Sequence, residues 1–197
     1  RMKVLVVGAS GLLGRTLMKA FEGAGHTVVG TALTRQKAPL ILLDVHDDKQ
    51  VNSVLANIKP EIVVFASSNQ VSEGVKASLD PVGCVAAGAT AVNAWVLLVS
   101  SDEVSRVEEG AAPSDFVAGK MKDEQSLQKA TNGDCGVLRV SVLYGPLQKI
   151  GESAITVLAK TVFPRVRQDV KPDNRKLKFP LYSPDVAAAV VALAEAR

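Results

Sequence analysis

The feature that most constrains this chain is a run of three glycines directly after a short apolar segment. Residues 3–7 read Lys-Val-Leu-Val-Val, and Gly8, Gly11 and Gly14 follow at intervals of three. A strand that ends in such glycines and opens a helix is typical of the phosphate-binding turn of dinucleotide-binding folds. The first glycine allows a tight bend, the second lets backbone approach a pyrophosphate, and the third lets the helix pack closely on the strand.

The helix expected after this turn adds charge complementarity. Its N-terminus offers backbone N–H groups and the positive end of the helix dipole, both of which favour a phosphate. An α/β protein that uses the same turn without a ligand is the alternative interpretation. The expected cofactor contacts in the turn are Gly8, Ser10, Gly11, Leu12, Leu13 and Gly14.

Apolar segments and helical patterns alternate along the rest of the chain. Short apolar runs suited to buried parallel strands lie at 3–7, 27–31, 40–43, 61–66, 95–99 and 136–141. Helical patterns lie at 12–24, from Asp47-Asp48, from Asp80-Pro81, at 114–131 after Ser114 or Asp115, and from Ser183, which we expect to be a cap. The alternation predicts an α/β fold with a doubly wound, mostly parallel sheet, a Rossmann-type NAD(P)-binding fold.

Composition excludes several classes of protein. The chain has 197 residues, 47% of them hydrophobic, which suits a globular domain with one sizeable core. A net charge of +3 is too small to indicate nucleic-acid binding, and no apolar run approaches the roughly 20 residues of a membrane span. Two cysteines, Cys84 and Cys135, predict no disulfide framework, which suits a reducing compartment, so we expect a cytoplasmic protein. The two cysteines and two histidines also predict no metal site.

The second strand favours one form of the dinucleotide. NAD-binding sites place an acidic residue about 20 positions past the glycines to accept the ribose 2′-hydroxyl. Here no acid occurs between Glu22 and Asp44, and Arg35 follows the strand instead. An arginine can pair with a 2′-phosphate through two charge-assisted bonds, so we expect NADP(H). The alternative is that Arg35 is an ordinary exposed charge.

Two further strand ends are expected near the cofactor. Asp44 and Val45 end the third strand, where the carboxylate either reaches the adenine amino group or caps the following helix. Ala66 and Ser67 end the fourth strand, where small residues let the backbone pass close to the cofactor.

These motifs, taken in order with three later ones, resemble a known family. The later motifs are Ser100-Ser101-Asp102, the LRVSVLYG sequence at 138–145, and Asp185-Val186-Ala187. The chain resembles the extended short-chain dehydrogenase/reductases, and within them the dTDP-4-dehydrorhamnose reductase branch. It is most similar to the group of regulatory beta subunits of methionine adenosyltransferase in that branch, and residues 152–157 add to this similarity.

The resemblance implies a catalytic set of Ser or Thr, Tyr and Lys. In that set the tyrosine is the general acid/base, and a lysine four residues later lowers its pKa and holds the cofactor ribose. Ser101 and Lys122 match the serine and lysine positions, but Ala118 stands at the tyrosine position. Moving the register to Lys120 puts Phe116 there, and neither side chain transfers a proton.

No tyrosine elsewhere restores the pattern. The chain has only Tyr144 and Tyr182, and neither is followed by a lysine four residues on. A general acid/base contributes roughly 10²–10⁴-fold to rate, so its loss predicts a protein that keeps a cofactor and turns over poorly. Ser101 has a second interpretation, as a polar cap at a strand end.

The resemblance also implies a function and a domain organisation. We expect an NADP(H)-binding, catalytically impaired regulatory protein of S-adenosylmethionine biosynthesis, with a methionine adenosyltransferase catalytic subunit as its partner. The alternatives are an active NADPH-dependent reductase of a nucleotide-linked keto-sugar and a cofactor-sensing module of a larger assembly. Members of the family are usually about half as long again. We therefore expect a Rossmann-type domain over 1–163, and a partial substrate-lobe segment with a returning helix over 164–197.

Overall fold

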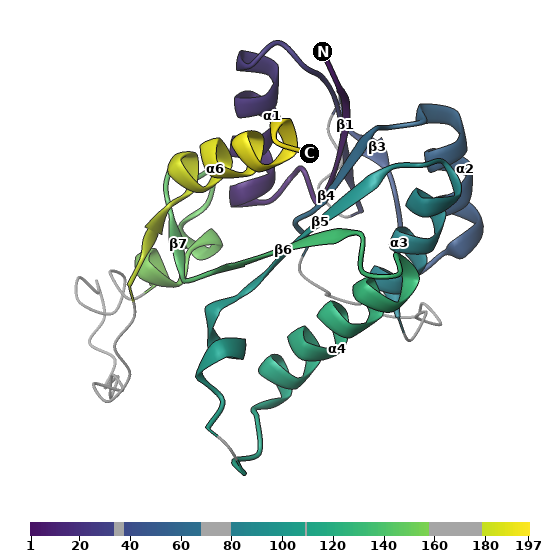
Figure 1. Cartoon of the computed structure of the whole chain (residues 1–197). Helices are drawn as coiled ribbons and strands as arrows, with labels where there is room; N and C mark the ends of the chain where they lie inside the picture. Colours follow the sequence, from purple (N-terminus) through teal and green to yellow (C-terminus); the bar gives the residue numbers. More distant parts are fainter. Residues whose placement is uncertain (34–37, 68–79, 109, 158–178) are drawn as a thin grey trace.

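Six parallel strands form the central sheet of this protein. The computed structural model describes residues 1–33, 38–67, 80–108, 110–157 and 179–197. The strands run in the order β3-β2-β1-β4-β5-β6 (Figure 1). Their bounds are β1 (Lys3–Val7), β2 (Thr27–Ala32), β3 (Ile41–Leu42), β4 (Ile62–Phe65), β5 (Trp95–Ser101) and β6 (Cys135–Val140). The predicted doubly wound parallel sheet is therefore confirmed.

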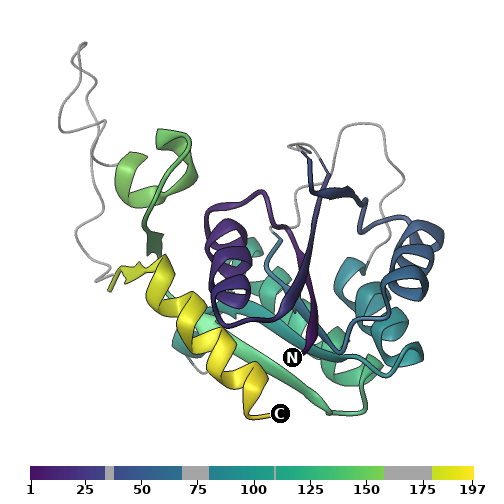
Figure 2. The same ribbon diagram turned by 90° about the horizontal axis from the view of Figure 1, so that it is seen from above.

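Five helices cover the two faces of this sheet. They are α1 (Leu12–Gly23), α2 (Asp48–Ile58), α3 (Pro81–Ala91), α4 (Asp115–Ala130) and α6 (Ser183–Glu195). Helices α1 and α6 pack together on one face, and α2, α3 and α4 cover the other (Figure 2). The structure also has two short 3₁₀ helices, η1 (Asp102–Arg106) and η2 (Ile150–Glu152), and a small parallel pair, β7 (Leu143–Tyr144) with β8 (Leu181–Tyr182).

Strand β1 shows why the apolar runs are continuous. Its side chains alternate in direction, so Val4 and Val6 join the cluster beneath α1 and α6, while Leu5 and Val7 join the cluster on the opposite face. All four are buried. A strand covered on both faces needs apolar residues at every position, which is the pattern that the sequence presents.

Three helices begin at caps that the sequence signals. The Asp47 carboxylate accepts the Lys49 and Gln50 N–H groups at 3.0 and 3.1 Å and caps α2. Asp80 accepts the Gly83 N–H at 2.9 Å, and Pro81 opens α3. Ser114, not Asp115, caps α4. These side chains satisfy N–H groups that a helix leaves free in its first turn.

The prediction that Ser183 caps the last helix is wrong by one residue. Tyr182 is the N-cap of α6 and makes no capping bond, whereas Ser183 lies inside the helix. The Ser183 hydroxyl is fully buried and has no hydrogen-bond partner among the described residues. This hydroxyl packs closely against the loop after β7, where a Cβ on Gly145 would collide with it.

The domain division after residue 163 falls between the described ranges, which end at 157 and resume at 179. None of the described helices has the length and apolar character that crossing a membrane requires. The described residues also hold no group of three or more His, Cys, Asp or Glu side chains that could bind a metal ion.

Candidate functional site

The glycine turn lies at the carboxyl end of β1 and touches the end of β4. Gly8 has φ of +89°, and a Cβ there would lie 2.8 Å from the backbone of Ser67. The Ala66 N–H donates to the Val7 carbonyl at 2.9 Å, which holds the two strand ends together. The structure thus brings Gly8, Ala66 and Ser67 to one place, and their contact with a cofactor stays a prediction.

The third glycine fixes the approach of α1 to the turn. A Cβ on Gly14 would lie 2.7 Å from the Ala9 Cα and closer still to the Gly8 carbonyl oxygen. Gly11 is the N-cap of α1 and donates its N–H to the Gly8 carbonyl at 3.1 Å. No side chain caps this helix, and its first turn contains no acidic residue. The positive end of the α1 dipole therefore faces the glycine turn, and the first helical turn adds no carboxylate that would compete with a phosphate.

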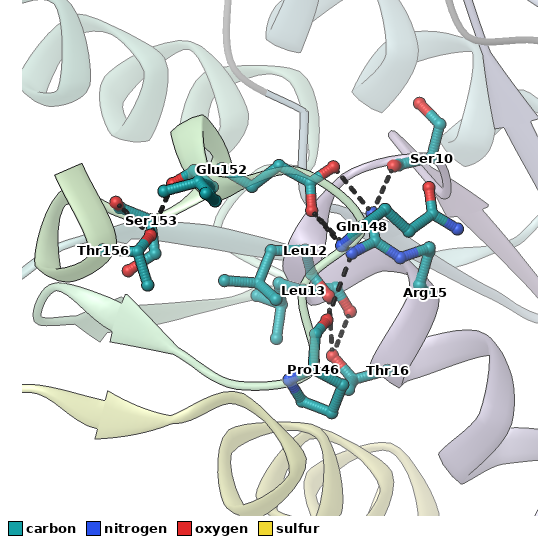
Figure 3. Close-up of polar contacts among 11 residues, drawn as sticks. Ser10, Leu12, Leu13, Arg15, Thr16, Pro146, Gln148, Glu152, Ser153 and Thr156 are labelled. Atoms are coloured by element: carbon teal, nitrogen blue, oxygen red, sulfur yellow. Dashed lines mark hydrogen bonds and ion pairs between the residues drawn. The ribbon is translucent and has the colours of Figure 1, made fainter. Parts of the chain in front are cut away.

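Arg15, which the sequence analysis did not single out, braces the same turn. Its Nη1 donates to the Ser10 carbonyl oxygen at 2.8 Å and to Glu152 Oε1 at 3.1 Å. Its Nη2 donates to Glu152 Oε2 at 2.8 Å and to the Pro146 carbonyl oxygen at 3.3 Å (Figure 3). No local pattern signals this contact, because the two charged residues are 137 positions apart.

Asp44 lies just past β3 and does not cap the next helix. Its carboxylate accepts the His46 N–H at 2.9 Å, and its own N–H donates to the Gln50 side chain. Asp47 caps α2 instead, so the capping interpretation of Asp44 is wrong. Val45 is buried in the cluster beneath α2. A contact of either residue with adenine stays a prediction, and Arg35 lies outside the described residues.

A pocket of about 410 Å³ opens at the ends of β5 and β6, beside the start of α4. Ser101 lines it and also accepts the Glu103 N–H at 3.3 Å, so its interpretation as a strand-end cap is confirmed. The pocket is lined by Ser100, Ser101, Asp102, Glu103, Phe116, Lys120, Val140, Ser141, Val142 and Leu143.

Helix α4 presents Phe116 and Lys120 to this pocket, four residues apart and therefore on one helix face. Ala118 and Lys122 are exposed and are not among the lining residues. A displacement of two positions turns a helical side chain by about 200°, which explains why both registers cannot face the pocket. Of the two registers, the one with Phe116 and Lys120 lines this pocket, and a catalytic role for Lys122, with Ala118 at the tyrosine position, stays a prediction.

Charged groups beneath the pocket hold α4 against the sheet. Buried Glu124 accepts the Ser100 hydroxyl at 2.6 Å and the Arg139 Nε and Nη2 groups at 3.0 and 2.6 Å. Burial acts to raise the pKa of Glu124, but hydrogen bonds from Arg139 and Ser100, with the charges of Arg139 and Lys120, outweigh it, so the pKa is lowered. Lys120 Nζ also lies 3.4 Å from Asp123 Oδ2.

Residues 2–197 match the family model described as RmlD substrate binding domain. The chain therefore belongs to this family of extended short-chain dehydrogenase/reductases, and the resemblance found in its motifs is confirmed.

Known proteins of three kinds are similar to it. It is 29% identical to methionine adenosyltransferase 2 subunit beta of Pongo abelii, over 99% of this chain and 63% of that protein. The structure superposes on dTDP-4-dehydrorhamnose reductase from Bacillus anthracis in complex with NADP, with a TM-score of 0.74 and 20% identity over 99% of this chain and 71% of that one. A UDP-glucose 4-epimerase of Thermotoga maritima gives a TM-score of 0.80 at 16% identity, over 98% and 74% of the two chains. The chain thus spans less than two thirds of the length of the beta subunit that it matches.

Proposed function

We propose that this chain binds NADP(H), with the pyrophosphate at the turn from Gly8 to Gly14. The turn supports this assignment because it admits no Cβ at Gly8 or Gly14 and leads into a helix N-terminus without a side-chain cap. The phosphorylated dinucleotide is favoured because no acid occurs between Glu22 and Asp44, where Arg35 stands. A reductase of similar fold has been solved in complex with NADP.

The direct test is a fluorescence titration of the protein with NADPH and with NADH under the same conditions. We expect tighter binding of NADPH, and we expect Arg35→Ala to weaken NADPH binding while leaving NADH binding unchanged. Tighter NADH binding would contradict the NADP(H) preference, and no binding of either nucleotide would contradict the assignment of the turn.

We infer further that redox chemistry at this site is impaired. The observation that carries this inference is the missing tyrosine, because Ala118 stands four residues before Lys122 and Phe116, which lines the pocket with Ser101, stands four residues before Lys120. A phenyl ring donates no proton, so reduction of a carbonyl there lacks its general acid. Ser101 and Lys120 retain the ability to bind a carbonyl or hydroxyl oxygen of a bound molecule.

A matched pair of variants tests this inference. Phe116→Tyr adds a hydroxyl at the pocket, and Ala118→Tyr adds a whole tyrosine outside the pocket lining. We expect only Phe116→Tyr to raise oxidation of NADPH by nucleotide-linked keto-sugars. A larger gain from Ala118→Tyr would support the register that has Ala118 at the tyrosine position and Lys122 as the lysine.

We propose that the whole protein acts as a regulatory subunit of methionine adenosyltransferase and so in S-adenosylmethionine biosynthesis. The support is its similarity to methionine adenosyltransferase 2 subunit beta over 99% of the chain. Two free cysteines suit the reducing cytoplasm that we propose as its location. Purification with a methionine adenosyltransferase catalytic subunit, followed by measurement of the mass of the complex, tests this proposal, and two separate species would contradict it.

The second candidate is an active reductase of a nucleotide-linked keto-sugar. It is favoured by the presence of Ser101 and Lys120 in the pocket, together with the carboxylates of Asp102 and Glu103. Turnover by the unaltered protein at the rate of an intact family enzyme would establish this candidate and defeat the regulatory one.

A further inference from the structure

One partly buried ion pair links the glycine turn to a distant segment. The carboxylate of Glu152 faces the guanidinium of Arg15 with both oxygens, and the two side chains are only 7% and 18% exposed. Glu152 Oε2 also accepts the Gln148 N–H at 3.1 Å (Figure 3). Paired bonds of this kind fix orientation as well as distance, since both groups are planar.

We propose that Arg15 and Glu152 are positioning residues that hold the phosphate turn ready for the cofactor. This proposal rests on the proposed NADP(H) site. The arginine carries four acceptors on its two terminal nitrogens, namely the two Glu152 oxygens and the carbonyl oxygens of Ser10 and Pro146. Both terminal nitrogens of Arg15 therefore donate to protein oxygens, so the arginine acts on a ligand by holding the turn in place.

The geometry of one peptide group shows how this action works. The Ser10 carbonyl oxygen is held by Arg15 at 2.8 Å, and the N–H of the same peptide, on Gly11, is held by the Gly8 carbonyl at 3.1 Å. Because a peptide group is planar, fixing both ends fixes its plane. The Gly11 residue caps α1, so this plane sets the direction in which the first N–H groups of the helix point.

The far side of the ion pair leads to the pocket. Ser153, next to Glu152, donates its hydroxyl to the Leu143 carbonyl at 2.6 Å, and Leu143 lines the pocket beside Ser101. The Ser153 carbonyl oxygen in turn accepts the Thr156 hydroxyl at 2.9 Å. Within the segment from 143 to 157, Leu143 lines the pocket and accepts the Ser153 hydroxyl, and the neighbouring Glu152 pairs with Arg15 directly after the phosphate turn. Any effect of order in this segment on binding at the turn is matched by an equal effect of binding on that order.

The test compares Glu152→Gln, which keeps the shape and removes the charge, with Asp134→Asn. Asp134 pairs with Arg197 at the surface, where the side chains are 67% and 46% exposed, and serves as the matched control. We expect Glu152→Gln to weaken NADPH binding roughly 5- to 50-fold. The control is expected to stay within about twofold of the unaltered protein. Arg15→Lys keeps the charge without the planar fork, and we expect an intermediate loss.

Hydrogen exchange without nucleotide gives the second readout. Glu152→Gln is expected to speed exchange in residues 8–14 and 143–157 and to leave β4 (Ile62–Phe65) unchanged, which separates loss of positioning from general unfolding. Faster exchange in these two segments without NADPH binding by any form would uphold the positioning role and refute the proposed cofactor. NADPH affinity within about twofold of the unaltered protein would overturn the positioning role, and so would exchange that rises equally in all strands.

Discussion

At the scale of single residues, Gly14 shows how a backbone contact limits the choice of side chain. The residue lies in the first turn of α1, where its Cα faces the backbone of Gly8 and Ala9. The close approach, rather than an unusual φ, excludes a side chain here. The close packing of α1 on the glycine turn therefore requires that residue 14 have no side chain.

Gly14→Ala is expected to lower the free energy of unfolding by about 1–3 kcal/mol, because the added methyl overpacks backbone that cannot move aside. The melting temperature should fall by roughly 3–10 °C, as measured by circular dichroism. Gly23→Ala, in the same helix with no atom within 4 Å of the added Cβ, is the control. It should raise stability by about 0.5 kcal/mol, and an equal loss in both variants would contradict the role of close approach.

Cys84 shows how surroundings can suppress a reactive side chain. Burial raises its pKa most, a hydrogen bond to Asp48 and the charge of Asp48 raise it further, and Asp80 and Asp47 add to the effect, giving a pKa of about 12. At pH 8 only about one such thiol in ten thousand is ionised. The thiolate is the nucleophile, so the folded protein should protect this cysteine from alkylation.

We expect iodoacetamide at pH 8 to modify Cys84 at least roughly 100-fold more slowly in the folded than in the denatured protein. The measurement uses mass spectrometry on a Cys135→Ser variant, in which Cys84 is the one remaining cysteine. Similar rates in the two states would show that the thiol is readily ionised in the fold.

At the scale of elements, Glu124 joins α4 to the ends of β5 and β6. Its partners are Ser100 on β5 and Arg139 on β6. The fold lowers the pKa of Glu124, so the ionised form stabilises the native state. This contribution is complete above the ordinary carboxyl pKa of 4.5 and disappears as the pH falls through the lower pKa of the folded state.

Glu124→Gln should therefore destabilise the protein by about 1–3 kcal/mol at pH 7, because it removes charge-assisted hydrogen bonds from a buried group. The difference from the unaltered protein should shrink as the pH falls below 4.5 and passes through the lowered pKa, where Glu124 itself becomes neutral. Urea unfolding over this pH range checks the prediction. Glu22→Gln on the exposed face of α1 is the control, and a constant difference across the range would contradict the assigned pKa shift.

The elements that could be predicted from the sequence are those specified by residues close together along the chain. The strands follow from continuous apolar runs, and Asp47 caps a helix within three residues of itself. The glycine turn is likewise complete within seven residues. The contact of Arg15 with Glu152 depends on tertiary folding, and so does the face of α4 that meets the pocket. Lys120 and Lys122 lie two positions apart, and the orientation of the helix, which the sequence does not give, decides which of them lines the pocket.

At the scale of the whole molecule, the sheet separates two apolar clusters. Phe21 belongs to the cluster under α1 and α6, and Leu55 belongs to the cluster under α2, α3 and α4. Both side chains are almost completely buried. Because every residue of β1 past Lys3 contributes to one cluster or the other, neither side should unfold alone.

Phe21→Ala and Leu55→Ala should each lower stability, by about 3–5 and 2–5 kcal/mol, through lost burial and the cavities that remain. Each variant is expected to show one transition, with the fluorescence of the single tryptophan, Trp95, and far-ultraviolet circular dichroism coinciding. Leu193→Ala, at an exposed position on α6, should change little. Separate transitions by the two probes would show that the two faces unfold independently.

The packing of α6 on α1 has a consequence for how the chain is made. The two helices form a large helix–helix contact, yet residue 183 is translated 160 positions after residue 23. At a ribosomal rate of 5–20 residues per second, that interval lasts roughly 8–30 s. Throughout it, the nascent chain carries Leu13, Leu17 and Phe21 without their final cover. The growing polypeptide therefore offers chaperones an apolar surface that the finished protein conceals.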